Sequence, residues 1–136
     1  MAFTVEVLDE VEYGHLTAGR ATELCSAALS ERGFDLDQVG ELSVALVGPR
    51  EIRRLNREFR GADRPTDVLS FEVDGPYGEM VGEVVICPAC ANPEMGTDEL
   101  VVHGTLHLTS MDHGENFEGS EMSRVQETVM ERMRGG

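Results

Sequence analysis

The chain has 136 residues, of which 40% are hydrophobic, and its formal net charge is −15. This length is typical of one domain with its own core, so we expect a single domain over residues 1–136. The sequence has neither an apolar run of membrane-spanning length nor a signal-peptide pattern at its start, which predicts a cytoplasmic protein with no membrane partner.

The basic residues are unevenly placed. All eleven are arginines, and six of them fall between residues 50 and 64. The acidic composition argues against general nucleic-acid binding, because cations contact phosphates. An arginine-rich strip on an acidic body can still bind RNA locally; the alternative is a solvated helix face.

The N-terminal third predicts two strands with a helix between them. Apolar residues alternate over 3–8, as in an edge strand, and again over 41–47. Between these segments an apolar stripe at helical spacing predicts a helix that Thr17 caps and Gly33 ends. Cys25 falls on this stripe and is interpreted as a small core residue.

A second helix and two further strands follow. Pro49 is suited to the first turn of a helix. The predicted buried stripe of this helix is Ile52, Leu55 and Phe59. Residues 67–71 and 81–86 are predicted strands, and the glycines and proline of residues 72–80 predict a loop between them.

Two helices complete the chain. Thr97 is the predicted N-cap of the first, which is apolar on several faces and is therefore expected to be buried. Met122, Val125, Val129 and Met133 form the stripe of the last. The order of elements predicts an α+β fold, a small mixed sheet of about four strands packed against several helices.

Three of the four histidines lie in one short segment, His103-Gly-Thr-Leu-His107-Leu-Thr-Ser-Met-Asp-His113. Residues at i and i+4 share a helix face, and a reversal of the chain can bring His113 to them. Three neutral imidazoles suit one zinc-like ion and leave a fourth position open. Such an ion can activate water or polarise a phosphoryl oxygen. The alternative is a buried helix with incidental histidines.

The histidine segment resembles the signature of the YbeY family of metal-dependent endoribonucleases, His-Gly-x-Leu-His-Leu-x-Gly-Tyr-Asp-His. Two further blocks of that family are present in the same order, Leu55-Asn-Arg-Glu-Phe-Arg60 with Asp63-Arg-Pro-Thr-Asp-Val-Leu-Ser-Phe71, and Gly82-Glu-Val-Val-Ile86. The resemblance runs from about residue 40 to the end. It implies cleavage of single-stranded RNA, maturation of the 3′ end of small-subunit ribosomal RNA, ribosome quality control, and possible ribosomal partners.

The chain departs from the family pattern at four places. Ser110-Met111 replaces Gly-Tyr, so the turn before His113 requires strain or another geometry. Glu72 stands where a proline is common, and Glu83 replaces an aspartate. The connection from Ile86 to His103 is short and rich in proline and glycine, which predicts no long helix there.

The resemblance also assigns candidate roles. Arg60 matches a family arginine associated with activity, and a guanidinium can stabilise charge on a phosphate in the transition state. Arg57 and Arg64 are candidate RNA contacts. Asp112 is either a hydrogen-bond partner of a ligating imidazole or a cap of the local turn. Cys87-Pro-Ala-Cys90 is a single pair and a weak metal or redox motif.

Two other functions fit parts of the pattern. Zinc peptidases of the metzincin type share the histidine spacing, but their general-base glutamate follows the first histidine, where this chain has Gly104. A non-enzymatic ribosome-associated module would use the metal only to stabilise the fold. That alternative predicts a fourth protein ligand, such as Cys87, Cys90 or a carboxylate.

Overall fold

The computed structural model describes residues 3, 5–114 and 117–135; Thr4, within the first predicted strand, lies outside them. Four strands form one mixed sheet in the order β1-β2-β4-β3. They are β1 (Val5–Asp9), β2 (Val39–Leu46), β3 (Val68–Asp74) and β4 (Met80–Ile86). Strands β1, β2 and β4 are parallel, and β3 pairs antiparallel with β4 at the sheet edge. The predicted α+β fold is confirmed.

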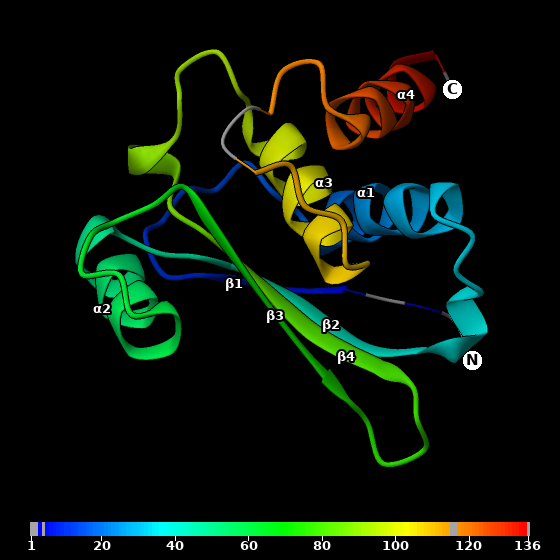
Figure 1. The fold of residues 1–136 in the computed structure, drawn as a ribbon, viewed down its shortest axis with the longest axis horizontal. Coiled ribbons are helices and arrows are strands. Elements are labelled where there is room, and N and C mark those ends of the chain that lie inside the picture. The colour runs from blue at the N-terminus through cyan, green and yellow to red at the C-terminus, as the bar shows by residue number, and fades with distance from the viewer. Residues whose placement is uncertain (1–2, 4, 115–116, 136) are drawn as a thin grey trace.

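Helices cover the two faces of the sheet unequally (Figure 1). Helices α1 (Ala18–Glu31), α3 (Thr97–Leu108) and α4 (Glu121–Gly135) lie on one face. Helix α2 (Pro49–Arg60) lies alone on the other. Two short 3-10 turns, Leu36–Gln38 and Pro88–Cys90, complete the regular structure, and the second of them is the only helical turn in the connection between β4 and α3, all of whose residues the structure describes.

The alternation of side chains along the central strands separates two apolar clusters. Val44 and Leu46 of β2 pack into the large core beneath α1, α3 and α4. Ala45 and Val47 face the other way, into a small cluster that includes Ile52 of α2. Burial on both faces at the C-terminal ends of β2 and β4 explains the short continuous apolar runs there, Val44–Leu46 and Val84–Ile86.

Several predicted helix boundaries are confirmed. Thr17 caps α1 by accepting a hydrogen bond from the Arg20 N–H at 3.0 Å, and Gly33 takes a φ of +80° just after the helix. Pro49 is the first residue of α2. Cys25 is buried in the core, where burial raises the pKa of its thiol to about 11. It is a packing residue, as predicted.

Two boundary predictions are wrong. Strand β3 continues to Asp74, through the start of the predicted loop, because Glu72, Val73 and Asp74 pair with residues of β4. Cross-strand pairing overrides the local turn signals there. Thr97 does not cap α3: Gly96 is the N-cap residue, and the Thr97 hydroxyl donates to the Tyr13 hydroxyl at 2.7 Å.

The predicted buried stripe of α2 is wrong at one position. Ile52 is fully buried and Leu55 is half-buried, but Phe59 is 59% exposed. The helix packs on the sheet through its first turns, and its last turn lies beside the edge strand β3 (Figure 1). Periodicity identifies which face of a helix is apolar but not how far along the helix the sheet reaches.

Gly104 of α3 lies directly against the sheet. A Cβ atom there would be 2.4 Å from Cγ1 of Val84 and 3.0 Å from Cγ2 of Val68. We expect Gly104→Ala to lower the free energy of unfolding by about 1–2 kcal/mol, because overpacking a stiff buried valine outweighs the helix propensity of alanine. Urea denaturation measures the change.

Gly19 of α1 provides the matched control for this substitution. A Cβ atom at Gly19 would meet only Oγ1 of Thr17, at 3.9 Å, so Gly19→Ala should leave stability unchanged or raise it slightly. Equal urea midpoints for Gly104→Ala and the wild type would show that α3 does not approach the sheet as closely as described.

Within the part of the chain that the structure describes, none of the helices is both long and apolar enough to cross a bilayer.

Candidate metal centre

His103, His107 and His113 converge at the C-terminal end of α3. One potential ligand atom from each lies within 4.8 Å of the others. The ring centroids of His103 and His107 are 4.8 Å apart, and that of His113 is 5.3 Å from His103 and 5.6 Å from His107. The structure therefore brings together the three histidines that the spacing singled out.

Hydrogen bonds orient two of the rings. Nδ1 of His107 donates to the carbonyl of Met111 at 3.0 Å, and Nδ1 of His103 lies 2.9 Å from Oε1 of Gln126 on α4. Both Nδ1 atoms face oxygen acceptors, so each Nε2 keeps its lone pair. The two Nε2 atoms are 3.2 Å apart. A cation between them would turn this repulsive approach of lone pairs into a favourable one.

Burial disfavours the charged form of the His103 and His107 imidazoles. It lowers the pKa of His103 and of His107, since a charged ring loses hydration there, and the neighbouring histidines lower both further. Neutral imidazole is the form that binds a metal ion.

The donor set fits a tetrahedral ion. Two Zn–N bonds of about 2.0–2.1 Å at the tetrahedral angle would place their nitrogens about 3.4 Å apart. The observed 3.2 Å between Nε2 of His103 and Nε2 of His107 is close to that separation. Among the described residues, no cysteine or carboxylate joins the group. The fourth protein ligand that the non-enzymatic alternative predicts is therefore not found in this part of the chain.

The turn after α3 brings His113 back to the helix. Ser110 adopts a φ of +71°, the left-handed conformation that glycine would take without strain. The N–H of Ser110 donates to the carbonyl of His107, and the N–H of Met111 donates to the carbonyl of Leu106. Helices that end at a left-handed residue commonly close with such hydrogen bonds. The strain predicted for Ser110-Met111 is thus present, and His113 still reaches the cluster.

Asp112 acts within this turn. Its Oδ1 accepts the backbone N–H of His113 at 2.8 Å, and hydrogen bonds from the backbone of His113 and Gly114 lower the pKa of the carboxyl group. The structure shows the turn-capping alternative and gives Asp112 no hydrogen bond to a described imidazole. The partners that orient the rings are the Met111 carbonyl and Gln126. Gln126 could have been noticed as a polar residue in the apolar stripe of α4.

Arg60 ends α2 and reaches toward α3 across the edge strand. Its Nη2 donates to the carbonyl of Ser70 at 2.5 Å, and its guanidinium carbon lies 5.1 Å from the centre of the Phe71 ring. The hydroxyl of Ser70 in turn donates to the carbonyl of Gly104, next to His103. Arg60 and His107 line the same pocket of about 660 Å³. The structure therefore places Arg60 beside the histidine cluster.

The other arginine candidates differ in position. Arg57 is exposed one turn before Arg60, and its nearest carboxylate, on Asp63, is 3.9 Å away. Arg64 is exposed in the loop after α2, where its carbonyl accepts a hydrogen bond from the Asn56 side chain. Neither residue lines the pocket that Arg60 shares with His107.

Cys87 and Cys90 lie apart from the histidines. Their sulfur atoms are 2.9 Å from each other, and Cys87 belongs to the small cluster beneath α2. Burial and, after it, the hydrogen bond with the Cys90 thiol raise the pKa of the Cys87 thiol to about 11. Neither cysteine joins the histidine cluster or lines the pocket that His107 shares with Arg60, so the described structure gives this pair no place in the site.

The position of Gly104 also bears on the peptidase alternative. A metzincin glutamate would occupy this position, but here it packs against Val84 and Val68 of the sheet. A side chain at residue 104 would therefore point at the sheet, away from the histidine cluster. The glutamate that acts as proton acceptor in that mechanism is therefore missing from its position after the first histidine.

Comparisons with known proteins agree with this geometry. The model of the family described as Endoribonuclease YbeY matches residues 9–134. An Endoribonuclease YbeY of Rubrobacter xylanophilus is 67% identical over 99% of both chains. One from Colwellia psychrerythraea is 33% identical, over 78% of this chain and 76% of the relative. The match to a solution structure of a Thermotoga maritima protein covers 96% of this chain and 89% of that protein's chain, with a TM-score of 0.59 and 29% sequence identity. The chain belongs to the YbeY endoribonuclease family.

Proposed function

We propose that this chain is a metal-dependent endoribonuclease that cleaves single-stranded RNA. The observation that carries the proposal is the convergence of three imidazoles, one of which lines a pocket that Arg60 also lines. Its membership of an endoribonuclease family supports the same activity. By that relationship, the RNA is the 3′ end of small-subunit ribosomal RNA, cleaved in the cytoplasm during ribosome maturation and quality control, in contact with ribosomal partners.

His103, His107 and His113 would hold the ion, and we propose zinc, one ion per chain, because the set is three imidazoles and the Nε2 atoms of His103 and His107 are 3.2 Å apart, close to the spacing of two ligands of a tetrahedral zinc ion. When bound, the ion supplies a Lewis acid at the scissile phosphate. The chain contributes the orientation of that ion. Gln126 and the Met111 carbonyl fix two imidazoles, and α3 holds them against the core.

Arg60 contributes charge on the other side of the pocket. The hydrogen bond to Ser70 and the contact with the Phe71 ring hold the guanidinium in place while most of its N–H groups stay free. A fixed guanidinium can bind a phosphate through two parallel hydrogen bonds and stabilise the charge that develops during cleavage. Arg57 and Arg64 would extend the contact along the RNA backbone.

Cleavage assays test this function directly. Single-stranded RNA, single-stranded DNA, duplex RNA and a peptide are incubated with the purified chain, with and without a chelator. We expect cleavage of single-stranded RNA alone, lost with the chelator and restored by zinc. Cleavage that persists in chelator would contradict the metal site. Hydrolysis of the peptide instead would contradict the endoribonuclease assignment.

A further inference from the structure

The pocket beside the histidine cluster has apolar walls in addition to the charged and metal-binding groups that a phosphate site needs. It runs across the edge strand β3, from α3 to the last turns of α2. Charged and metal-binding groups form only part of its wall, because several of its lining residues are apolar. These apolar lining residues are Leu55, Phe59, Phe71 and Val73.

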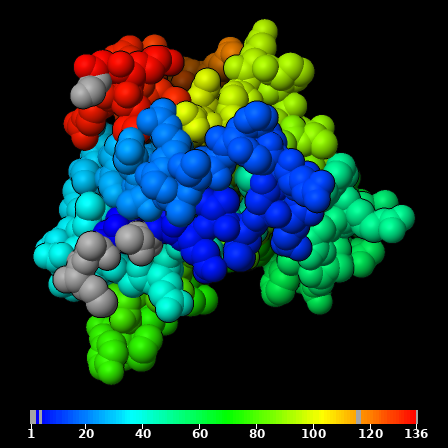
Figure 2. Space-filling view, turned by 180° about the vertical axis from the view of Figure 1, so that it is seen from behind, coloured from blue at the N-terminus to red at the C-terminus, as the bar shows by residue number. Residues whose placement is uncertain are grey.

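Phe59 is an exposed aromatic ring held in a defined position. It is 59% exposed, and its ring meets that of Phe71 edge-to-face with the centroids 5.5 Å apart. Val73, next along the same face of β3, is 63% exposed. Large apolar side chains gathered on a surface commonly mark a binding site. The segment of α2 protrudes at the side of the molecule (Figure 2).

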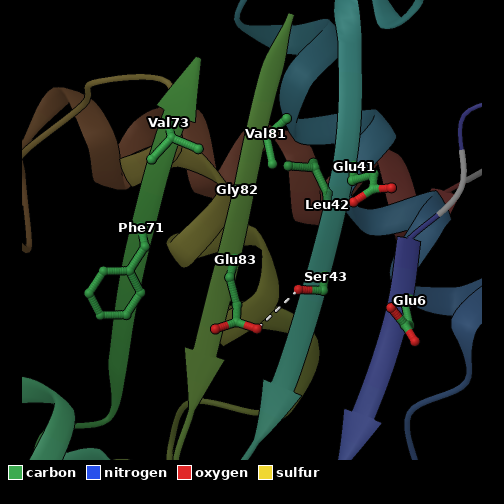
Figure 3. Close-up of a pocket in the computed structure, with 9 residues that line it drawn as sticks. All are labelled: Glu6, Glu41, Leu42, Ser43, Phe71, Val73, Val81, Gly82 and Glu83. Carbon is green, nitrogen blue, oxygen red and sulfur yellow. Dashed lines mark hydrogen bonds between the residues drawn. The ribbon is translucent and has the colours of Figure 1, made fainter. Parts of the chain in front are cut away.

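The charged residues that line the pocket with Phe59 favour a nucleobase over a phosphate as the group bound next to that ring. Glu72 and Glu83 line it together with Phe59. Phe71, Val73 and Glu83 project from neighbouring strands toward the same open side of the sheet (Figure 3). Carboxylates repel phosphate, but they accept hydrogen bonds from the N–H groups at base edges. Aromatic rings stack on bases.

We propose that Phe59, supported by Phe71, stacks on an unpaired nucleobase next to the phosphate that this site cleaves. The inference rests on the proposed endoribonuclease function and adds a base-binding subsite to it. Arg60 lines the same pocket as Phe59 and His107, where it can bind the phosphate that links the stacked base to the histidine cluster. A base in a duplex is already stacked and paired, so this subsite would select single strands.

The test combines protein variants with modified RNA. Phe59→Ala, Phe59→Tyr and Phe59→Trp are compared with wild type on a short single-stranded oligoribonucleotide in which each base in turn is replaced by an abasic residue. Tyr77→Ala is the matched control, because Tyr77 is a 92% exposed aromatic in the β3–β4 turn, outside the pocket. Metal content and urea midpoints are measured for every variant.

We expect Phe59→Ala to lower kcat/KM on intact RNA by about tenfold, as the loss of one aromatic stacking contact would. Tyrosine and tryptophan should restore it, and Tyr77→Ala should have no effect. In wild type, one abasic position near the cut should cause a similar loss, and Phe59→Ala should be insensitive to that position.

Three outcomes would overturn the subsite. Unchanged cleavage by Phe59→Ala would mean that the exposed ring serves another contact, such as a protein partner. Equal losses for intact and abasic RNA would show a structural role for the ring. Wild type that cleaves RNA but is insensitive to every abasic position would refute base binding while leaving the proposed function intact. Absence of any RNA cleavage by wild type would refute that function itself.

Discussion

The variant His107→Ala should contain almost no zinc and should not cleave RNA. Removing one of three imidazoles leaves an incomplete donor set, and affinity for the ion depends on all of its ligands. His107 also lines the pocket next to Arg60, so its loss affects both the ion and the wall that faces the substrate. Elemental analysis of the purified variant measures its metal content, and a single-stranded RNA assay measures its activity.

His15 provides the matched control for this variant. Its ring contacts that of Tyr13 edge-to-face, at 5.2 Å between centroids, and it does not belong to the histidine cluster. His15→Ala should therefore retain about one ion per chain, as expected for an intact three-histidine site. Equal metal content in wild type and His107→Ala would reject the proposed centre. Circular dichroism would show whether the variant keeps its helices.

Arg60→Ala should retain its ion and lose cleavage activity by about 10²–10³-fold, the usual cost of removing a group that stabilises transition-state charge. Arg60 is not a ligand, and its contacts with Ser70 and Phe71 lie on the surface, so stability should change little. Arg60→Lys should recover only part of the rate, because an ammonium group keeps the charge but not the bidentate geometry. Single-turnover cleavage rates measure the effect.

Arg132 serves as the control for the loss of an arginine. It lies on α4 and pairs with Glu31 at 2.7 Å, and it does not line the pocket at the histidine cluster. Arg132→Ala should cleave RNA at the wild-type rate. If Arg60→Ala also does so while keeping its metal, Arg60 has no part in the reaction.

Local patterns predicted most of the secondary structure and the histidines of the site. Some signals involve only a few neighbouring residues, so they predict strands and helix starts without knowledge of the fold. They include the apolar alternation in β2, the Thr17 cap of α1 and Pro49 at the start of α2. The spacing of His103 and His107 likewise determines that they share a face of α3, since helix geometry alone sets it. The replacement of glycine by Ser110 predicts either a strained left-handed turn or another geometry, and the structure has the left-handed turn.

Contacts between distant segments decided the rest. The length of β3 depends on its pairing with β4. The exposure of Phe59 depends on where the sheet ends. The orientation of the His103 ring depends on Gln126, which belongs to another helix. The sequence by itself determined the element types, the α+β class and three histidines able to share an ion. Only the tertiary structure decided which rings converge, what orients them, and which side chains from α2 and β3 meet them, because those distances depend on how the elements pack.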